Sequence, residues 1–270
     1  MVAAKQTRYG MTGTGRSALW VGAGMLVSRL AGLVRDRVFA HYFGNSAAAD
    51  AFRAAFRIPN VLQNLFGEGV LSASFIPVYA GLLARNNPRR AGEVAGGIAA
   101  ILGLLTSVLV LIGVSITPLL IDLIAPGFEG DKRDLTICLV RILFPGAGLL
   151  VLSAWCLGIL NSHRRFFLSY AAPVIWNAAV IASLVAFGAA YDQSALARAA
   201  AWGSVAGSLL QLALQVPTVL RLAGPIRLAL NTGLAEVRQV LRTSVPVLFS
   251  RGVVQISAYV DSMIASPLPT

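Results

Sequence analysis

Long apolar stretches alternate with short polar connections along the whole chain. A helix needs about 20 apolar residues to cross a bilayer, and about seven stretches of that length recur here. The predicted spans are residues 18–43, 51–84, 94–124, 135–160, 166–190, 196–220 and 240–268. The second and the seventh span contain prolines, so we expect kinked helices there. The pattern predicts an all-α polytopic membrane protein.

The spans divide the chain into four parts. Residues 1–17 form a polar, basic tail, and residues 18–222 hold the first six spans. Residues 223–239 mix apolar and basic positions with glycine and proline, and we expect this linker to lie along the membrane interface. Residues 240–270 then contain the seventh transmembrane helix.

Composition supports a membrane protein. Hydrophobic residues make up 57% of the 270 residues, charged residues only 12%, and the mean hydropathy is +0.74. Soluble domains carry about 25% charged residues. The net charge of +11 comes from basic residues spread over the connections rather than gathered in one patch, which argues against a nucleic-acid-binding protein.

Charge in the connections predicts the orientation. The tail and every second connection are basic: Lys5, Arg8, Arg16, Arg85, Arg89, Arg90, Arg164, Arg165, Arg221, Arg227, Arg238 and Arg242. The other connections hold Lys132, Arg133 and Arg198 beside Asp122, Glu129, Asp131, Asp134 and Asp192. Because basic connections stay in the cytoplasm, we expect a cytoplasmic N-terminus.

Charged residues also occur within the predicted spans, and the cationic ones are in excess. The arginines are Arg29, Arg35, Arg37, Arg53, Arg57, Arg141 and Arg251. The carboxylates are Asp36, Asp50, Glu68 and Asp261. An arginine in hydrocarbon costs about 2.5–3.5 kcal/mol even on the lenient insertion scale. Buried ion pairs and snorkelling account for some of these arginines, and the remainder indicates a polar cavity that binds an anion.

The spacing of the polar residues places them on helix faces. In the second span, polar residues recur every three or four positions: Arg53, Arg57, Asn60, Asn64 and Glu68. In the first span Arg29 shares a face with Asp36, and Arg35 lies on the adjacent strip with Ser28. We expect the two polar faces to meet across a water-filled cleft. A guanidinium matches phosphate oxygens bidentately, so a phosphate or diphosphate is the predicted ligand.

Other chemistry is not indicated by the sequence. There is no phosphate-cradling glycine loop, no histidine–glutamate metal motif and no serine–histidine pair spaced for nucleophilic catalysis. The two cysteines lie 18 residues apart in one predicted helix, which separates them by about 27 Å and excludes a disulfide. We therefore predict no metal site and no cofactor. Nothing in the pattern calls for an enzyme, although carboxylates alone can catalyse and an enzyme stays an alternative at this point.

Several segments together carry a family resemblance. Residues 28–44 read SRLAGLVRDRVFAHYFG, and residues 48–78 read AADAFRAAFRIPNVLQNLFGEGVLSASFIPV. Both closely resemble the N-terminal signature of the MurJ/MviN family of lipid II flippases, in the multidrug/oligosaccharidyl-lipid/polysaccharide exporter superfamily. APGF at 125–128, ILNSHRRF at 159–166 and SVPVLFSRGVVQIS at 244–257 extend the resemblance over nearly the whole chain.

The resemblance implies a fold and a set of site residues. The family has about fourteen transmembrane helices in two six-helix lobes plus an extra pair, and this chain resembles the first lobe and the seventh helix. Arg29, Arg35 and Asp36 then fall on the cavity-lining first helix. Arg57 and Asn60 fall on or beside the second helix. Gating or structural roles are expected for Asp50, Asn64, Glu68 and Arg251. Gln63 stands where family members often carry an arginine, and Arg53 or Arg57 would take over its charge.

The function implied is the movement of lipid II, an undecaprenyl-diphosphate-linked peptidoglycan precursor, from the cytoplasmic to the periplasmic leaflet by alternating access. The partners implied are this precursor, membrane lipids and cell-wall synthesis proteins, with a coupling ion or the membrane potential as driving force. The place implied is the bacterial cytoplasmic (inner) membrane. The alternatives are an exporter of another polyprenyl-diphosphate-linked saccharide, a non-transporting membrane scaffold and an intramembrane transferase on the same carrier.

Overall fold

The computed structural model describes the backbone of residues 3–224, 226, 228–230 and 232–265, and side chains from residue 21 to residue 253 apart from those of 68, 225, 227 and 231. Within these residues every regular element is an α-helix. In chain order they are α1 (Ala3–Phe43), α2 (Ala47–Phe66), α3 (Glu68–Ala84), α4 (Pro88–Ser115), α5 (Thr117–Ile124), α6 (Gly130–Ser162), α7 (Phe166–Phe187), α8 (Gln193–Ala223) and α9 (Ala235–Ala265). The predicted all-α fold class is confirmed.

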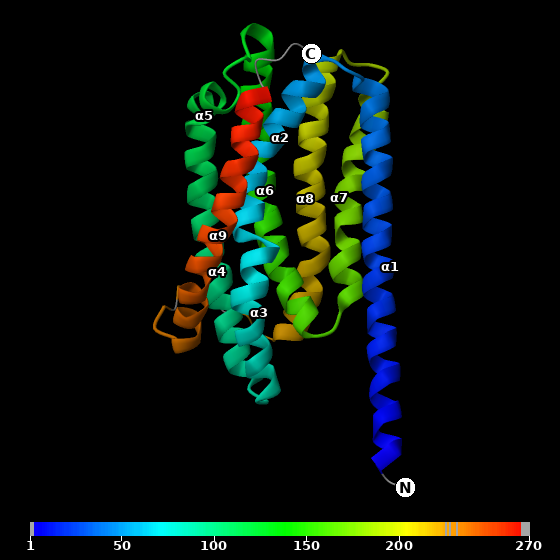
Figure 1. The fold of residues 1–270 in the computed structure, drawn as a ribbon, viewed down its shortest axis with the longest axis vertical. Coiled ribbons are helices and arrows are strands. Elements are labelled where there is room, and N and C mark those ends of the chain that lie inside the picture. Colours follow the sequence, from blue (N-terminus) through cyan, green and yellow to red (C-terminus); the bar gives the residue numbers. More distant parts are fainter. Residues whose placement is uncertain (1–2, 225, 227, 231, 266–270) are drawn as a thin grey trace.

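The helices run roughly parallel to one long axis, and α1 projects beyond the bundle at its N-terminal end (Figure 1). Within the described residues, five segments are long and apolar enough to cross a membrane: Ala47–Ala84, Pro88–Ser115, Gly130–Ser162, Phe166–Phe187 and Gln193–Ala223. The first and last predicted spans lie in α1 and α9, whose side chains are described only in part. The helices therefore follow the predicted order of spans.

The second span is two helices, α2 and α3, separated at Gly67. The Gly67 N–H donates to the Gln63 carbonyl at 2.8 Å, which closes α2. A Cβ at position 67 would overlap that same carbonyl oxygen, so the corner requires glycine. Pro59 and Pro77, at which we expected kinks, lie inside α2 and α3. The interruption comes from the glycine between them.

Short polar residues begin several of the helices. The Ser46 hydroxyl accepts from the Ala49 N–H at the start of α2, and the Asn87 side chain accepts from the Arg90 N–H at the start of α4. Asp192 caps α8 in the same way. Such caps satisfy N–H groups that the helix itself leaves without partners.

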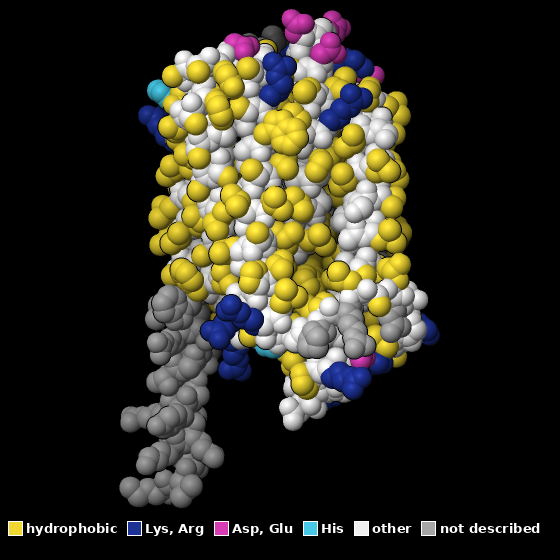
Figure 2. Space-filling view, turned by 180° about the vertical axis from the view of Figure 1, so that it is seen from behind, with side chains coloured by type: hydrophobic (Ala, Val, Ile, Leu, Met, Phe, Trp, Pro, Cys, Tyr) yellow, Lys and Arg dark blue, Asp and Glu magenta, His cyan; other side chains and the backbone are white. Residues whose placement is uncertain are grey.

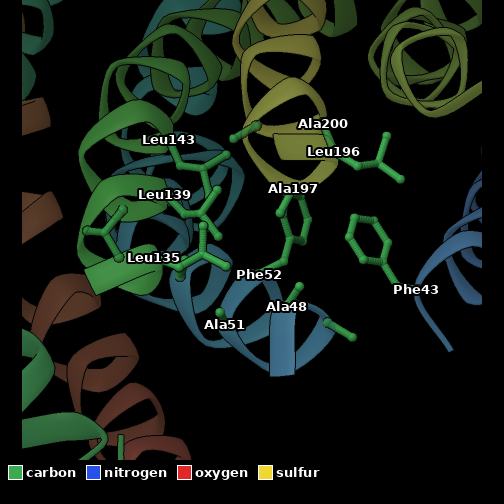
Figure 3. Close-up of a cluster of buried hydrophobic side chains, with 14 of the residues drawn as sticks. Phe43, Ala48, Ala51, Phe52, Leu135, Leu139, Leu143, Leu196, Ala197 and Ala200 are labelled. Carbon is green, nitrogen blue, oxygen red and sulfur yellow. The ribbon is translucent and has the colours of Figure 1, made fainter. Parts of the chain in front are cut away.

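The interior contains two apolar clusters. The upper one joins the end of α1 to α2, α6, α7 and α8. Its members in Figure 3 include Phe43, Ala48, Ala51, Phe52, Leu135, Leu139, Leu143, Leu196, Ala197 and Ala200. Alanines on facing helices let the backbones approach closely, as in other membrane bundles. The lower cluster joins α3, α4, α6, α8 and α9, with Phe75 and Tyr79 fully buried.

The outer surface is apolar between charged ends. Figure 2 shows a broad hydrophobic band with acidic side chains concentrated at the upper end and basic ones at both ends. The connections α3–α4, α6–α7 and α8–α9 lie at the lower end in Figure 1, and α1–α2, α5–α6 and α7–α8 lie at the upper end. This is the grouping that the alternation of charge predicts.

The linker between α8 and α9 is shorter than predicted. Helix α9 begins at Ala235, five residues before the predicted start of the seventh span. The described residues from 224 to 234 are not helical. One reason for the early start is an ion pair in the first turn of α9, where Arg90 of α4 donates two hydrogen bonds to Glu236 at 2.8 and 3.1 Å.

Candidate functional site: a cationic cavity

A cavity of about 530 Å³ opens between α1, α2 and α7. It is lined by Arg35, Asp36, Phe39, Phe52, Arg53, Phe56, Arg57, Trp176 and Val180. Helix α2 begins at Ala47, after its cap Ser46. Because an α-helix has 3.6 residues per turn, Arg53 and Arg57 lie on the same side of α2, about one turn apart. The lining therefore brings three guanidinium groups and one carboxylate together within the described part of the chain.

Arg35 occupies the centre of this arrangement. Its guanidinium donates to the Asp36 carboxylate from Nη2 at 2.8 Å and from Nε at 3.1 Å. It also lies over the ring of Trp176 on α7, with Cζ 5.1 Å from the ring centroid. The Arg35 side chain is 27% exposed, while that of Asp36 is 67% exposed. Solvent thus reaches the carboxylate more easily than the guanidinium that it neutralises.

The α2 arginines add charge to the cavity wall. The Arg53 guanidinium lies 5.7 Å from the centroid of the Phe39 ring of α1, an arrangement in which the ring face stabilises the cation. Arg57 is exposed and lines the same cavity. Among the described lining residues, three are arginines and one is an aspartate.

A second, smaller cavity of about 220 Å³ shares Arg35, Phe56 and Trp176 with the first. Its other walls are largely amide, hydroxyl and apolar: Asn60, Gln63, Leu150, Ser153, Ala154, Leu157, Pro173 and Gln211. The Ser153 hydroxyl of α6 links two glutamines of α8, accepting from Gln211 at 2.8 Å and donating to Gln215 at 2.6 Å. A compartment lined mainly by uncharged side chains, with Arg35 at its shared wall, thus adjoins the larger cavity.

Of the residues predicted for the site, some come together and others do not. Arg35, Asp36, Arg53 and Arg57 line the large cavity, and Asn60 and Gln63 line the small one. Other predicted residues lie elsewhere: Arg29 is exposed on α1 and Asn64 is half-buried on α2, both outside the described linings of these two cavities. The side chain of Glu68 lies outside the described residues.

The predicted structural residues have identifiable contacts. Asp50, in the first turn of α2, accepts a hydrogen bond from Lys132 of α6 at 3.0 Å. That lysine also lies 4.2 Å from the Phe128 ring centroid. The Arg251 guanidinium of α9 lies directly against the Cα of Gly69, where any larger side chain would collide with it. These contacts tie α2 to α6 and α3 to α9.

The sequence analysis missed the contribution of the later helices. Trp176 of α7, Ser153 of α6 and Gln211 of α8 complete the two cavities. A usable signal was present: Gln211 and Gln215 lie four residues apart in an apolar helix and therefore share one face. Polar side chains in that position need internal partners, which Ser153 supplies.

Comparison with known proteins identifies the family. The family model described as "Lipid II flippase MurJ" matches residues 39–270. The lipid II flippase MurJ of Burkholderia cenocepacia is 31% identical over 262 residues, covering 94% of this chain and 50% of that protein. The probable lipid II flippase MurJ of Rhizobium tropici is 34% identical over 256 residues, covering 91% of this chain and 47% of that protein.

Structural similarity agrees with the sequence match. A solved structure of lipid II flippase MurJ in an inward closed conformation superposes with a TM-score of 0.75 at 24% identity, covering 93% of this chain and 51% of that one. The chain thus spans about half the length of the relatives that it matches. With the family model covering most of the sequence, the chain belongs to the MurJ family of lipid II flippases, which are transporters rather than enzymes.

Proposed function

We propose that this chain forms the substrate-binding first lobe of a flippase that moves lipid II from the cytoplasmic to the periplasmic leaflet of the bacterial inner membrane. The observation that carries the proposal is the cavity between α1, α2 and α7, with three guanidinium groups and one carboxylate in its wall. Family membership supports lipid II as the substrate, and the arginine-lined cavity supports a binding site for its diphosphate.

The chemistry of the cavity suits a diphosphate. A guanidinium presents its N–H donors as a fork that binds two phosphate oxygens at once, and such charge-assisted hydrogen bonds are about twice as strong as neutral ones. The Arg35 guanidinium lies over the face of Trp176, which holds it in the cavity wall before the ligand arrives. Asp36 then competes with the phosphate for the Arg35 N–H groups. Arg53 and Arg57 approach from α2, on the other side of the cavity. The diphosphate would then lie between two helices.

The cycle that we propose is alternating access. In transporters with two related lobes, the substrate stays near the lobe interface while the lobes rock around it. A substrate shifts such an equilibrium only by binding one conformation better than the other. Arg35 can exchange its Asp36 contact for a phosphate, and a conformation in which this exchange is easier would bind the substrate better. The basic connections at the lower end of Figure 1 would face the cytoplasm, with the N-terminus on the same side.

The test is complementation of a lipid II flippase depletion by the complete gene that contains this sequence. Rescue of growth would support lipid II as the substrate, and absence of rescue by a protein present at a normal level would favour another polyprenyl-diphosphate-linked saccharide. Arg35→Gln and Arg53→Gln are expected to abolish or strongly reduce rescue. Arg37→Gln is the matched control, because Arg37 is exposed on the same helix as Arg35 but outside the described cavity lining.

Binding isolates the cavity from the rest of the cycle. Undecaprenyl diphosphate should bind the purified protein, while undecaprenol, which lacks the charged group, should bind at least tenfold more weakly if charge-assisted hydrogen bonds dominate. Equal binding of the two lipids would refute the diphosphate site. If the Arg35 and Arg53 variants keep normal membrane levels and full rescue, the arginines are structural and the proposal fails.

A further inference from the structure

Arg141 is an arginine inside a predicted span that the proposed transport site does not use. It is exposed on α6 and lines a separate groove of about 470 Å³ between α6 and α8. The other lining residues are Asp134, Ile137, Cys138, Ile142, Pro145 and Trp202. Within the described residues, no hydrogen bond, ion pair or ring contact of Arg141 exists. We propose that this groove binds one phospholipid whose headgroup combines a phosphate with a primary ammonium, as in phosphatidylethanolamine.

The depth of Arg141 fits a lipid phosphate. Helix α6 has 33 residues and is therefore about 50 Å long, about 20 Å more than the hydrocarbon core. A centred helix projects about 10 Å at each end, and Arg141 is eleven residues, or about 16 Å, from the α6 start at Gly130. Its backbone then lies about 6 Å inside the hydrocarbon, a depth from which an arginine side chain snorkels to the phosphate level.

Trp202 lies at a matching depth on the neighbouring helix. It is nine residues, about 13 Å, from the α8 start at Gln193, and its side chain is 62% exposed. Exposed tryptophans concentrate where headgroups meet acyl chains, because the ring is apolar and the indole N–H is polar. The groove therefore has the apolar body and polar upper edge that a phospholipid requires. Figure 2 shows basic side chains below acidic ones at the upper end of the face opposite to that of Figure 1.

Asp134 sets the chemistry of the headgroup. It lies seven residues before Arg141, which places both on one face of α6 about 10 Å apart along the axis. Its side chain is 79% exposed, and its carboxylate is 3.8 Å from the Arg133 guanidinium. A purely anionic headgroup on Arg141 would meet this carboxylate unfavourably, whereas an ammonium group beyond the phosphate would be attracted to it. Charge complementarity thus favours a zwitterionic lipid.

Pro145 adds a second polar feature to the groove. As proline lacks an N–H, it leaves the carbonyl oxygen of Arg141 without its usual helical donor. Polar backbone atoms at membrane depth need a partner, but this carbonyl lies about 10 Å along the axis from Asp134, so the ammonium group donates to the Asp134 carboxylate alone. A quaternary ammonium has no N–H to donate. The groove should therefore prefer phosphatidylethanolamine to phosphatidylcholine.

The test measures lipids retained by the intact protein after purification in detergent, by native mass spectrometry, with phosphatidylethanolamine, phosphatidylglycerol and phosphatidylcholine added in equal amounts. We expect one tightly held phosphatidylethanolamine. Arg141→Gln should reduce its retention at least tenfold, because a hydrogen-bonded charged partner is lost. Asp134→Asn should keep a bound lipid but remove the preference for phosphatidylethanolamine over phosphatidylglycerol. Arg198→Gln, an exposed α8 position outside the described groove lining, is the matched control and should change nothing.

Two further measurements keep the outcome clear. Arg141→Lys retains the charge and should give intermediate retention, and the melting temperature of each variant shows whether the fold is intact. Displacement of the lipid by millimolar inorganic phosphate would show that the groove recognises phosphate alone. That result would overturn the proposal. Equal lipid retention by wild type and Arg141→Gln would overturn it too. So would the absence of any retained lipid, which is the outcome expected if another part of the protein covers this face.

Discussion

Replacing Asp36 by asparagine should tighten diphosphate binding while slowing transport. The Asp36 carboxylate lies 2.8 Å from the Arg35 guanidinium and is the one acidic group in the described lining of the large cavity. A charge pair near a protein surface attracts by about 4 kcal/mol at 4 Å with an effective dielectric constant of 20. The Asp36 side chain is 67% exposed, so solvent screening reduces the net interaction free energy of the ion pair to about 0.2–1 kcal/mol.

The ligand gains from two sources when this carboxylate is neutralised. It no longer competes with Asp36 for Arg35, and it no longer meets a like charge, whose repulsion at roughly 7 Å in water is about 0.6 kcal/mol per phosphate charge before screening by salt. Together these effects amount to about 0.5–1.5 kcal/mol, which corresponds to about a two- to tenfold lower Kd. Slower transport follows because a tighter complex releases its lipid less often.

The assay is a titration of purified wild-type and Asp36→Asn protein with undecaprenyl diphosphate at fixed salt, with Arg35→Gln as the variant expected to lose affinity. Trp176 forms part of the cavity wall, so the binding isotherm can be followed by tryptophan fluorescence. Raising the salt concentration should narrow the difference between wild type and Asp36→Asn. Weaker binding by Asp36→Asn would refute the reasoning, because Asp36 would then be needed to position Arg35 rather than to compete for it.

Three further predictions concern the scaffold. Gly67→Ala should lower the free energy of unfolding by about 1–3 kcal/mol through overlap with the Gln63 carbonyl, whereas Gly103→Ala, with open space around it, should not destabilise in the same melting experiment. Burial, and then Arg165, lower the pKa of His163 from its ordinary 6.5, so the unfolded chain binds the proton first. The melting temperature should therefore fall as the pH drops below about 6.5, and His163→Gln, which also changes the contact with the Tyr79 hydroxyl at 3.1 Å, should flatten this dependence. The hydrogen bond from Arg90 lowers the pKa of Glu236. Glu236→Gln should therefore lower the free energy of unfolding by about 0.2–1 kcal/mol. Amide hydrogen exchange should become faster in the first turns of α9 and stay unchanged in α7.

The order of the spans was predictable from the sequence, because a membrane-spanning helix needs a long apolar run and little else. The break between α2 and α3 was not. Pro59 is the stronger local signal, yet α2 continues through it, since membrane helices tolerate proline where neighbouring groups satisfy the freed carbonyl. Gly67 interrupts the span because a local backbone arrangement excludes a Cβ there. Such an arrangement is visible only in three dimensions.

The candidate site residues on α1 and α2, which carry charge, could be predicted from the sequence. Those on α6, α7 and α8 could not. The spacing of Arg53, Arg57 and Asn60 identified their helix face, and the structure divides that face between the two cavities. Helix periodicity gives the face of a residue but not the helix that it meets. The partners of Arg35 beyond Asp36 therefore remained unknown, and Trp176 enters only because α7 packs against α1.

The volume of the large cavity bears on how three guanidinium groups can be placed in its wall. One water needs a cavity volume of about 10–15 Å³, and the large cavity offers about 530 Å³, so the guanidinium groups of Arg53 and Arg57 can keep a solvent shell. The cost of placing them in hydrocarbon is thereby avoided. A ligand that enters must replace this water with equally good acceptors, which phosphate oxygens provide and a neutral lipid does not. We therefore expect the large cavity to bind a lipid with an anionic headgroup better than a neutral lipid.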